Sequence, residues 1–325
     1  MGTDIESKQD VYNMYWAIFC GIIIATGLVV NAFITLVNII DWSRERSLKL
    51  CDKVLSVLCL TRFLLLWFFL LELIGGFMQL IHFSAFGTFC IFYIFELSLD
   101  YFSRWLAMWL SVLYYVMITI SKHALVLRLK SRIPMITRYI LGGSMLISIL
   151  AATSFSLSGE EYPCVQNTGT NVTGNVTSQF TQPFILTSVF LGQCLPYMIE
   201  IISSLYLLCT LFIHVKRRVS SASSPNMDAH WSVMRYILVL NLLSMCNFLG
   251  NLSIWFWMSY NDLLGISLGY ILVYSYPVLH SIVFIPSNSK LKREIRHLFH
   301  CTKLFCCSMK DQLDSRAQTV PQRSV

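Results

Sequence analysis

The sequence predicts an all-α membrane protein, a bundle of seven transmembrane helices, because it is rich in apolar residues, poor in charge and contains seven long apolar runs. Of the 325 residues, 56% are hydrophobic and only 13% are charged, whereas soluble domains carry about 25% charged residues. A chain of this composition cannot cover a water-facing surface, so we expect lipid to be its solvent. Backbone in lipid must satisfy its own hydrogen bonds, and the apolar runs are therefore predicted to be helices.

Each of the seven runs is long enough to cross a bilayer core of about 30 Å, which requires about 20 helical residues. They cover residues 14–40, 54–81, 86–120, 133–156, 184–215, 233–258 and 263–286. The first run lacks a basic region before it and is longer than the apolar part of a signal peptide. We therefore expect it to remain in the membrane, behind an extracellular N-terminus of residues 1–13.

The segment after the seventh run has a different pattern. Residues 288–300 place apolar side chains at helical spacing with basic residues between them. This pattern predicts an amphipathic juxtamembrane helix that lies on the lipids of the inner leaflet. Residues 301–325 are predicted to form a cytoplasmic tail, which is polar from about residue 309.

The distribution of the 24 Lys and Arg residues predicts the direction of the helices. Lys8 lies on the N-terminal side, Arg62 and Arg104 lie within spans, and the others lie in the alternate loops and the tail. Positive charge collects on the cytoplasmic side of a membrane protein. We therefore expect the N-terminus outside and the C-terminus inside, in the plasma membrane. The net charge of +7 reflects this topology and does not indicate a nucleic-acid partner.

The predicted external loop between the fourth and fifth runs carries features of cell-surface proteins. Asn171 and Asn175 each begin an Asn-Val-Thr sequence and are predicted glycosylation sites. Cys164 lies in the same loop, and Cys90 lies at the outer end of the third run. A disulfide between them is compatible with an oxidising compartment. The alternative is that both thiols stay free.

Ionisable side chains interrupt the apolar runs at six positions, which are Arg62, Glu72, Glu96, Asp100, Arg104 and Glu200. Each costs about 2.5–3.5 kcal/mol at a helix centre, so we expect each to face the bundle interior, a partner or water. Asp100 lies four residues from both Glu96 and Arg104, so all three share one helix face. Two interpretations follow: Arg104 neutralises Asp100, or Asp100 stays free beside Glu96.

Short motifs occur along the predicted spans, at Asn31-Ala32-Phe33-Ile34, Leu60-Thr61-Arg62, Leu195-Pro196, Tyr276-Pro277, His280-Ser281 and Lys290-Leu291-Lys292. Together they resemble the type 2 taste receptors, the bitter taste receptor family, across nearly the whole chain. The Asp-Arg-Tyr and Asn-Pro-x-x-Tyr motifs of rhodopsin-like receptors are absent from the third and seventh runs. Thr61 and Glu200 stand where the family pattern has Ser, so the chain resembles a divergent member.

The resemblance implies a G-protein-coupled receptor that binds small bitter compounds in a cavity open to the outside. It also implies activation of a gustducin-like heterotrimeric G protein at the cytoplasmic face. The ligand-binding positions that it implies are Glu72, Glu96, Asp100, Glu200, Asn247 and Tyr270. Because four of these are acids with one base nearby, we expect cationic or basic amphiphilic ligands. The alternative is that the buried carboxyl groups stay protonated and act as hydrogen-bond donors.

The resemblance also implies structural or switch positions, at Asn31, Arg62, Tyr114, His214 and Ser281. Arg62 lies deep in the second run, where the family also has Arg. We expect it to join Asn31 and Ser281 in a polar network that connects the first, second and seventh helices.

Other classes of membrane protein fit the sequence less well. A vomeronasal type 1-like chemosensory receptor is the nearest alternative. A small-molecule transporter is a further one, but the two halves of the chain show no similarity of the kind found in transporters. A light receptor needs a Lys in the seventh helix, and residues 263–289 contain none. The sequence has neither a metal-ligand cluster nor a Ser/His/Asp arrangement, so we expect no enzyme activity, metal or cofactor.

Overall fold

The computed structural model describes residues 2–45, 50–78, 86–119, 124–158, 177–219, 227–260, 262–288, 290–297, 300 and 309. All regular structure within these residues is helical. The elements are α1 (Gly2–Glu45), α2 (Leu50–Met78), α3 (Phe86–Thr119), α4 (Ala124–Ser158), α5 (Thr177–Val189), the π-helical segment η1 (Phe190–Cys194), α6 (Leu195–Val219), α7 (Met227–Tyr260) and α8 (Leu263–Ser287). The chain forms two units, Met1–Val283 and Phe284–Val325, which are described separately.

The described elements correspond to seven continuous helices, because α5, η1 and α6 follow one another without a break. Each of the seven overlaps one predicted span, although residues 79–81 of the second span lie outside the described residues. Six of these helices are long and apolar enough to cross a membrane. The seventh, α3, has 34 residues and is also long enough, but Glu96, Asp100 and Arg104 make it less apolar.

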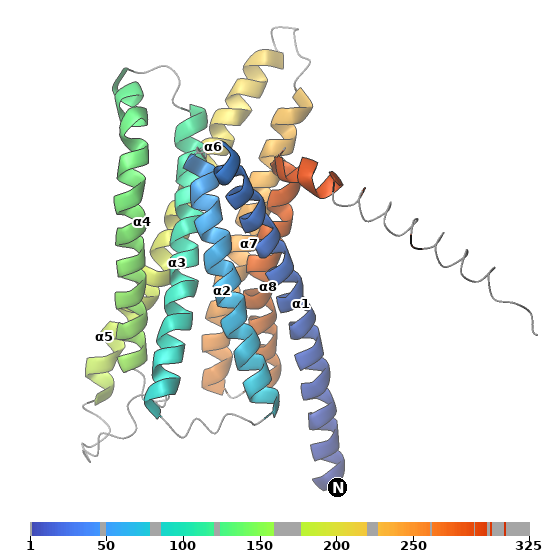
Figure 1. Ribbon diagram of the computed structural model, residues 1–325. Helices are drawn as coiled ribbons and strands as arrows, with labels where there is room; N and C mark the ends of the chain where they lie inside the picture. The colour runs from blue at the N-terminus through green and yellow to red at the C-terminus, as the bar shows by residue number, and fades with distance from the viewer. Residues whose placement is uncertain are drawn as a thin grey trace, which may run out of the picture. The chain divides into compact units, whose positions relative to one another are not determined.

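Helix α3 lies inside the first unit, where it packs against α2, α4, η1 and α6 (Figure 1). The side chains of residues 101–108 are all buried, so this part of α3 is covered on every face. A helix that is surrounded by other helices does not meet lipid with its charged side chains. The cover over this part of α3 therefore keeps Arg104 away from lipid, while Glu96 and Asp100 precede it and are partly exposed.

Apolar clusters among the described residues hold the helices of the first unit together, and two of them involve α7 or α8. One joins α1, α2 and α8 through Cys20, Ile24, Leu66, Phe69, Tyr274 and Val278, among others. Gly27 permits the close approach of these helices, since a Cβ atom there would lie 2.6 Å from Val278. The other cluster joins α6 and α7 through Leu207, Leu211, Val215, Met234 and Ile237.

The outward faces of the helices carry large apolar side chains. Ile22, Val29, Tyr139, Leu186 and Leu264 are each between 60% and 75% exposed. Exposed large apolar side chains occur on every one of the seven helices. These side chains are suited to contact with lipid, as the composition predicts.

The second unit contains a helix over residues 290–297, within the range 288–300 predicted for a juxtamembrane helix. Asn288 begins it, because its side-chain carbonyl accepts the backbone N–H groups of Lys290 at 3.0 Å and Leu291 at 3.5 Å. This is the arrangement of an N-cap residue. The predicted tail lies outside the described residues except for residue 309.

Candidate ligand-binding site

A cavity of about 110 Å³ lies among α2, α3, α7 and α8, and we call it the acidic cavity. Four of the six predicted ligand-binding residues line it: Glu72 on α2, Glu96 and Asp100 on α3, and Tyr270 on α8. Its other lining residues are mostly aromatic or aliphatic, with the aromatic ones at Phe69, Tyr93, Tyr101, Phe155 and Tyr274. An apolar pocket with a few convergent polar groups is the usual form of a small-molecule site.

The three carboxylates of the acidic cavity differ in their partners. Arg104 donates from Nη2 to Asp100 Oδ2 at 2.5 Å, so the first of the two interpretations of Asp100 is the one observed. Glu72 accepts a long hydrogen bond of 3.4 Å from the Tyr274 hydroxyl. Glu96 makes no hydrogen bond or ion pair with the described residues. The acidic cavity therefore has two carboxylates, Glu72 and Glu96, that no described base neutralises.

The other two predicted ligand-binding residues, Glu200 and Asn247, do not line the acidic cavity. They line a separate space of about 20 Å³, which we call the Glu200 cavity, together with Arg104, Gln193, Tyr197, Ser244, Phe248 and Tyr276. Glu200 is 8% exposed and accepts a 2.8 Å hydrogen bond from Ser244. The space is about large enough for one water molecule. Glu200 thus belongs to the packed interior between α6 and α7.

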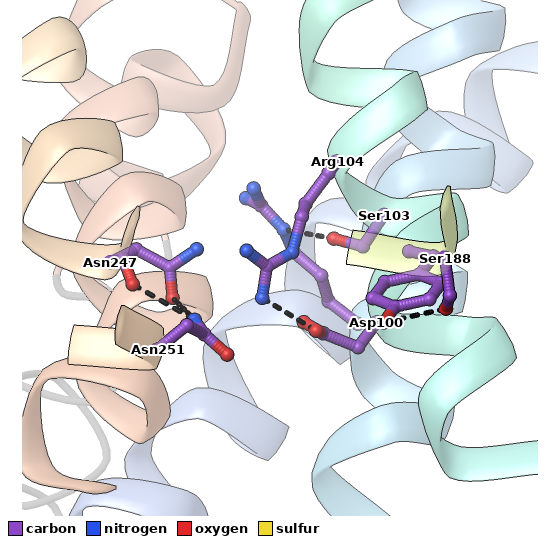
Figure 2. Close-up of polar contacts among 8 residues, drawn as sticks. Asp100, Ser103, Arg104, Ser188, Asn247 and Asn251 are labelled. Atoms are coloured by element: carbon purple, nitrogen blue, oxygen red, sulfur yellow. Dashed lines mark hydrogen bonds and ion pairs between the residues drawn. The ribbon is translucent and has the colours of Figure 1, made fainter. Parts of the chain in front are cut away.

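Gln193 and Arg104 connect the two cavities. Gln193 lines both of them. Arg104 lines the Glu200 cavity and pairs with Asp100, which lines the acidic one. In Figure 2 the Arg104 side chain extends from α3 toward Asp100, with Asn247 and Asn251 of α7 on the opposite side of the view. Asn251 donates hydrogen bonds to the backbone and side-chain oxygens of Asn247, at 2.9 and 3.4 Å.

The π-helical segment η1 places Gln193 at this junction. The backbone N–H of Leu195 bonds to the carbonyl of Phe190, five residues earlier, and Pro196 has no N–H to donate. The wider turn leaves backbone carbonyls available, and Trp105 on α3 donates to that of Leu191 at 3.2 Å. Gly192 lets α3 approach, since a Cβ atom there would lie 2.5 Å from Tyr101. Such π segments frequently occur at functional sites.

Comparison with known proteins identifies the family. Residues 9–303, most of the chain, match the family model described as Taste receptor protein (TAS2R). The chain belongs to this taste receptor family. It is 29% identical to mouse taste receptor type 2 member 102, with 84% of each chain covered. It is 27% identical to mouse taste receptor type 2 member 110, over 96% of this chain and 98% of that one. It is 25% identical to gorilla taste receptor type 2 member 8, over 86% and 93%.

Membership of the family establishes the class of the protein. It is a bitter taste receptor with the seven-transmembrane fold of G-protein-coupled receptors, and a multi-pass protein of the plasma membrane. Tastant ligands and coupling to G proteins are general properties of such receptors. The family is one of receptors and not of enzymes.

Two of the predicted switch residues of this taste receptor contact each other. The Ser281 hydroxyl on α8 donates to the side-chain carbonyl of Asn31 on α1 at 2.9 Å. The Asn31 amide in turn donates to the carbonyl of Gly27 at 2.9 Å. Asn31 and Ser281 are both almost fully buried, so this bond connects the first and seventh transmembrane helices inside the receptor core.

Arg62 contacts different groups from those expected. It is fully buried and donates from Nε to Ser103 on α3 at 3.2 Å, while its guanidinium lies 5.0 Å from the ring centre of Tyr276 on α8. No hydrogen bond joins it to Asn31 or Ser281 among the described residues. The expectation of a single network was therefore wrong in its partners, because the long side chain reaches across to α3 and α8. This ring contact is a cation–π interaction.

The remaining predicted sites have mixed outcomes. Tyr114 packs beside the α6–α7 cluster and lines a space of about 30 Å³ with Glu200 and His280. His214 lies in α6, but its side chain is outside the description. Cys90 is disulfide-bonded, while Cys164 lies outside the described residues, so their pairing stays a prediction. The predicted glycosylation sites Asn171 and Asn175 also lie outside them.

Several residues of the site were not predicted from the sequence, namely Gln193, Ser244, Tyr274 and Tyr276. Each is a polar residue within a long apolar run, at a position where a packed core residue is the usual interpretation. The sequence Gly192-Gln193-Cys194-Leu195-Pro196 is a signal for irregular helix, because Pro196 removes one backbone donor. Tyr276 was noted only as part of the Tyr276-Pro277 motif, and nothing comparable marks Ser244.

Proposed function

We propose that this taste receptor binds small cationic compounds in the acidic cavity and activates a gustducin-like heterotrimeric G protein at its cytoplasmic face. The observation that carries the proposal is Glu96. It lines the acidic cavity without a hydrogen-bond or ion-pair partner among the described residues, and Glu72 lines the same cavity. A carboxylate inside a membrane protein is costly unless a partner or water compensates its charge. A ligand ammonium group is the partner that fits.

The aromatic residues of the acidic cavity support the same ligand charge. Phe69 and Tyr274 have ring centres 4.5 Å apart, and Tyr270 and Tyr274 have ring centres 5.4 Å apart. Ring faces attract cations, and such groupings recognise quaternary ammonium ligands. The cavity would therefore attract an ammonium group through both its carboxylates and its rings.

The volume of the acidic cavity limits what it can enclose. Its 110 Å³ is below the range of about 300–1,000 Å³ for pockets that enclose drug-sized ligands. We expect the cavity to receive the charged end of a ligand, while an apolar remainder extends toward the outside. Basic amphiphiles have this form.

The direction of signalling rests on the distribution of basic residues. With the N-terminus outside, the loops that carry most Lys and Arg face the cytoplasm. The G protein would bind on that face, at the opposite end of the bundle from the ligand entrance. A basic face of this kind would be complementary to an acidic surface of a partner protein.

Calcium imaging tests the proposal in cells that coexpress the receptor with a gustducin-like chimeric G protein. The compounds are matched pairs of bitter substances, each a tertiary or quaternary amine and its uncharged analogue. We expect calcium responses to some of the cations and weaker responses to their analogues, and none in cells with the G protein alone. Responses confined to the uncharged compounds would contradict the charge of the ligand. A silent receptor at verified surface expression would contradict the coupling.

A further inference from the structure

Arg104 lies between two carboxylates that belong to different cavities. It pairs with Asp100, which lines the acidic cavity, and it lines the Glu200 cavity itself. The side chain of Arg104 is 8% exposed and that of Asp100 is 17% exposed. An Arg side chain does not lose its proton inside a protein, so a carboxylate beside it stabilises it where it is buried.

Both Arg104 and Glu200 retain unused hydrogen-bonding capacity. The Nε atom of Arg104 is buried and has no partner among the described residues. Glu200 accepts a bond from Ser244 at Oε1 only, and the described residues offer no donor to its other oxygen. Both side chains line the same space of about 20 Å³, which has room for about one water molecule. Glu200 is thus the carboxylate that shares a cavity with Arg104.

We propose that Arg104 is a positioning residue with two alternative partners, Asp100 and Glu200, and that a cationic ligand moves it from the first to the second. The inference rests on the proposed function, since it takes a cation as the ligand. A ligand ammonium bound by Glu96 lies in the same cavity as Asp100, one helical turn away, where it repels Arg104 and replaces it as the counter-ion of Asp100. Arg104 then pairs with Glu200, the carboxylate that shares its cavity. No covalent bond is made or broken. Asp100 and Arg104 each keep a partner of opposite charge.

This exchange on α3 would change contacts on four other helices, α6, α7, α8 and α2. Glu200 is bonded to Ser244 on α7, and Ser244 lies 3.3 Å from the hydroxyl of Tyr276 on α8. The Tyr276 ring lies under the guanidinium of Arg62 on α2. When Arg104 pairs with Glu200, the hydrogen bond from Ser244 to Glu200 weakens, and the contacts of Tyr276 change as a result. The packing of α6 against α7 then depends on whether Asp100 holds a ligand.

The first experiment needs neither agonist nor G protein. It measures the unfolding temperature of the purified receptor in detergent for Asp100→Asn, Glu200→Gln and the double variant. Each single variant leaves Arg104 one carboxylate, whereas the double variant leaves none. We therefore expect the fall in unfolding temperature of the double variant to exceed the sum of the two single falls. A fall equal to the sum of the two single falls would overturn the exchange, because the stability changes of two sites without a shared partner are additive.

A third substitution keeps this experiment decisive if the double variant does not fold. Adding Arg104→Leu to Asp100→Asn and Glu200→Gln removes the unpaired buried charge. We expect the triple variant to regain surface expression and most of the lost unfolding temperature. A triple variant that remains as unstable as the double variant would show that the two carboxylates do not act through Arg104.

The second experiment measures ligand-independent signalling. Asp100→Asn frees Arg104 to pair with Glu200, so basal signalling should rise about threefold or more, and Glu200→Gln in the same background should return it to the wild-type level. Asp262→Asn is the matched control, because it removes one charge outside both cavities while Asn can still accept the backbone N–H of Leu264. Unchanged basal signalling in Asp100→Asn would overturn the link to activation. A receptor silent to every cation, with a non-additive stability cycle, would instead contradict the proposed function alone.

Discussion

The indole N–H of Trp105 on α3 donates a 3.2 Å hydrogen bond to the backbone carbonyl of Leu191 in the π-helical segment η1. The bond supplies a partner to a carbonyl beside the irregular turn, and it holds α3 against the helix that carries Gln193 and Glu200. Since a neutral buried hydrogen bond contributes about 1 kcal/mol, Trp105→Phe should lower stability by about that amount, with some added cost from the smaller ring. The unfolding temperature of the purified receptor measures it.

The control for this substitution is Trp67→Phe on α2. Trp67 is 45% exposed and makes no hydrogen bond among those found in the described residues. Its replacement should shift the unfolding temperature little. Equal shifts in the two variants would show that the Leu191 bond does not stabilise η1.

Gly192 in η1 should tolerate no larger residue. A Cβ atom added at Gly192 would lie 2.5 Å from the ring of Tyr101. Tyr101 is 1% exposed, so its ring cannot move into open space. Gly192→Ala should therefore destabilise the receptor by about 1–3 kcal/mol, the usual cost of overpacking. Gly142→Ala on α4 is the control, because nothing lies within 4 Å of a Cβ atom there. Surface expression that is normal for both variants would contradict the close approach of α3 and η1.

The bond between Asn31 and Ser281 should appear as an energetic coupling between α1 and α8. A double-mutant cycle of Asn31→Ala and Ser281→Ala measures it through the unfolding free energies. We expect a coupling of about 0.6 kcal/mol, the mean for hydrogen bonds between transmembrane helices. Thr26→Ala replaces Ser281→Ala in the control cycle, because the Thr26 hydroxyl bonds only within α1, to Ile22 at 2.8 Å. A coupling of zero for Asn31 and Ser281 would show that the bond does not join the helices.

The predicted topology can be checked on intact cells. If residues 159–176 lie outside, Asn171 and Asn175 are accessible to the glycosylation machinery. Glycosidase treatment should then increase the mobility of the wild-type protein but not of the Asn171→Gln, Asn175→Gln variant. An N-terminal epitope tag should bind antibody without permeabilisation, and a C-terminal tag only after it. The reverse pattern of the two tags would contradict the orientation.

The seven helices could be predicted because the length of an apolar run and the distribution of basic residues depend on the membrane and not on details of packing. The pairing of Asp100 with Arg104 was one of two interpretations of the same spacing, and the structure shows which one holds. The sequence also predicted that Glu96 has no partner, because the acidic residues within the spans outnumber the bases near them.

The parts that could not be predicted depend on contacts between helices. The spacing of residues along α6 predicts which face of the helix carries Glu200, but it does not predict which residues of other helices lie beside it. The contact of Glu200 with Ser244 in a separate cavity was therefore missed. The partners of Arg62 depend on how far a long side chain reaches between α3 and α8. The π-helical turn at η1 has the same hydropathy as regular helix, and only Pro196 indicates it.

The dose response of Glu96→Gln to a cationic agonist and to its uncharged analogue tests directly whether Glu96 binds the charge of the ligand. Loss of a charge-assisted bond worth about 1.5–3 kcal/mol should raise the half-maximal concentration of the cation about 10- to 100-fold. The value for the uncharged analogue should change less than about threefold, and Asp262→Asn should change neither. If Glu96→Gln at normal surface expression responds to the cation like wild type, Glu96 does not bind the ligand charge and the central claim fails.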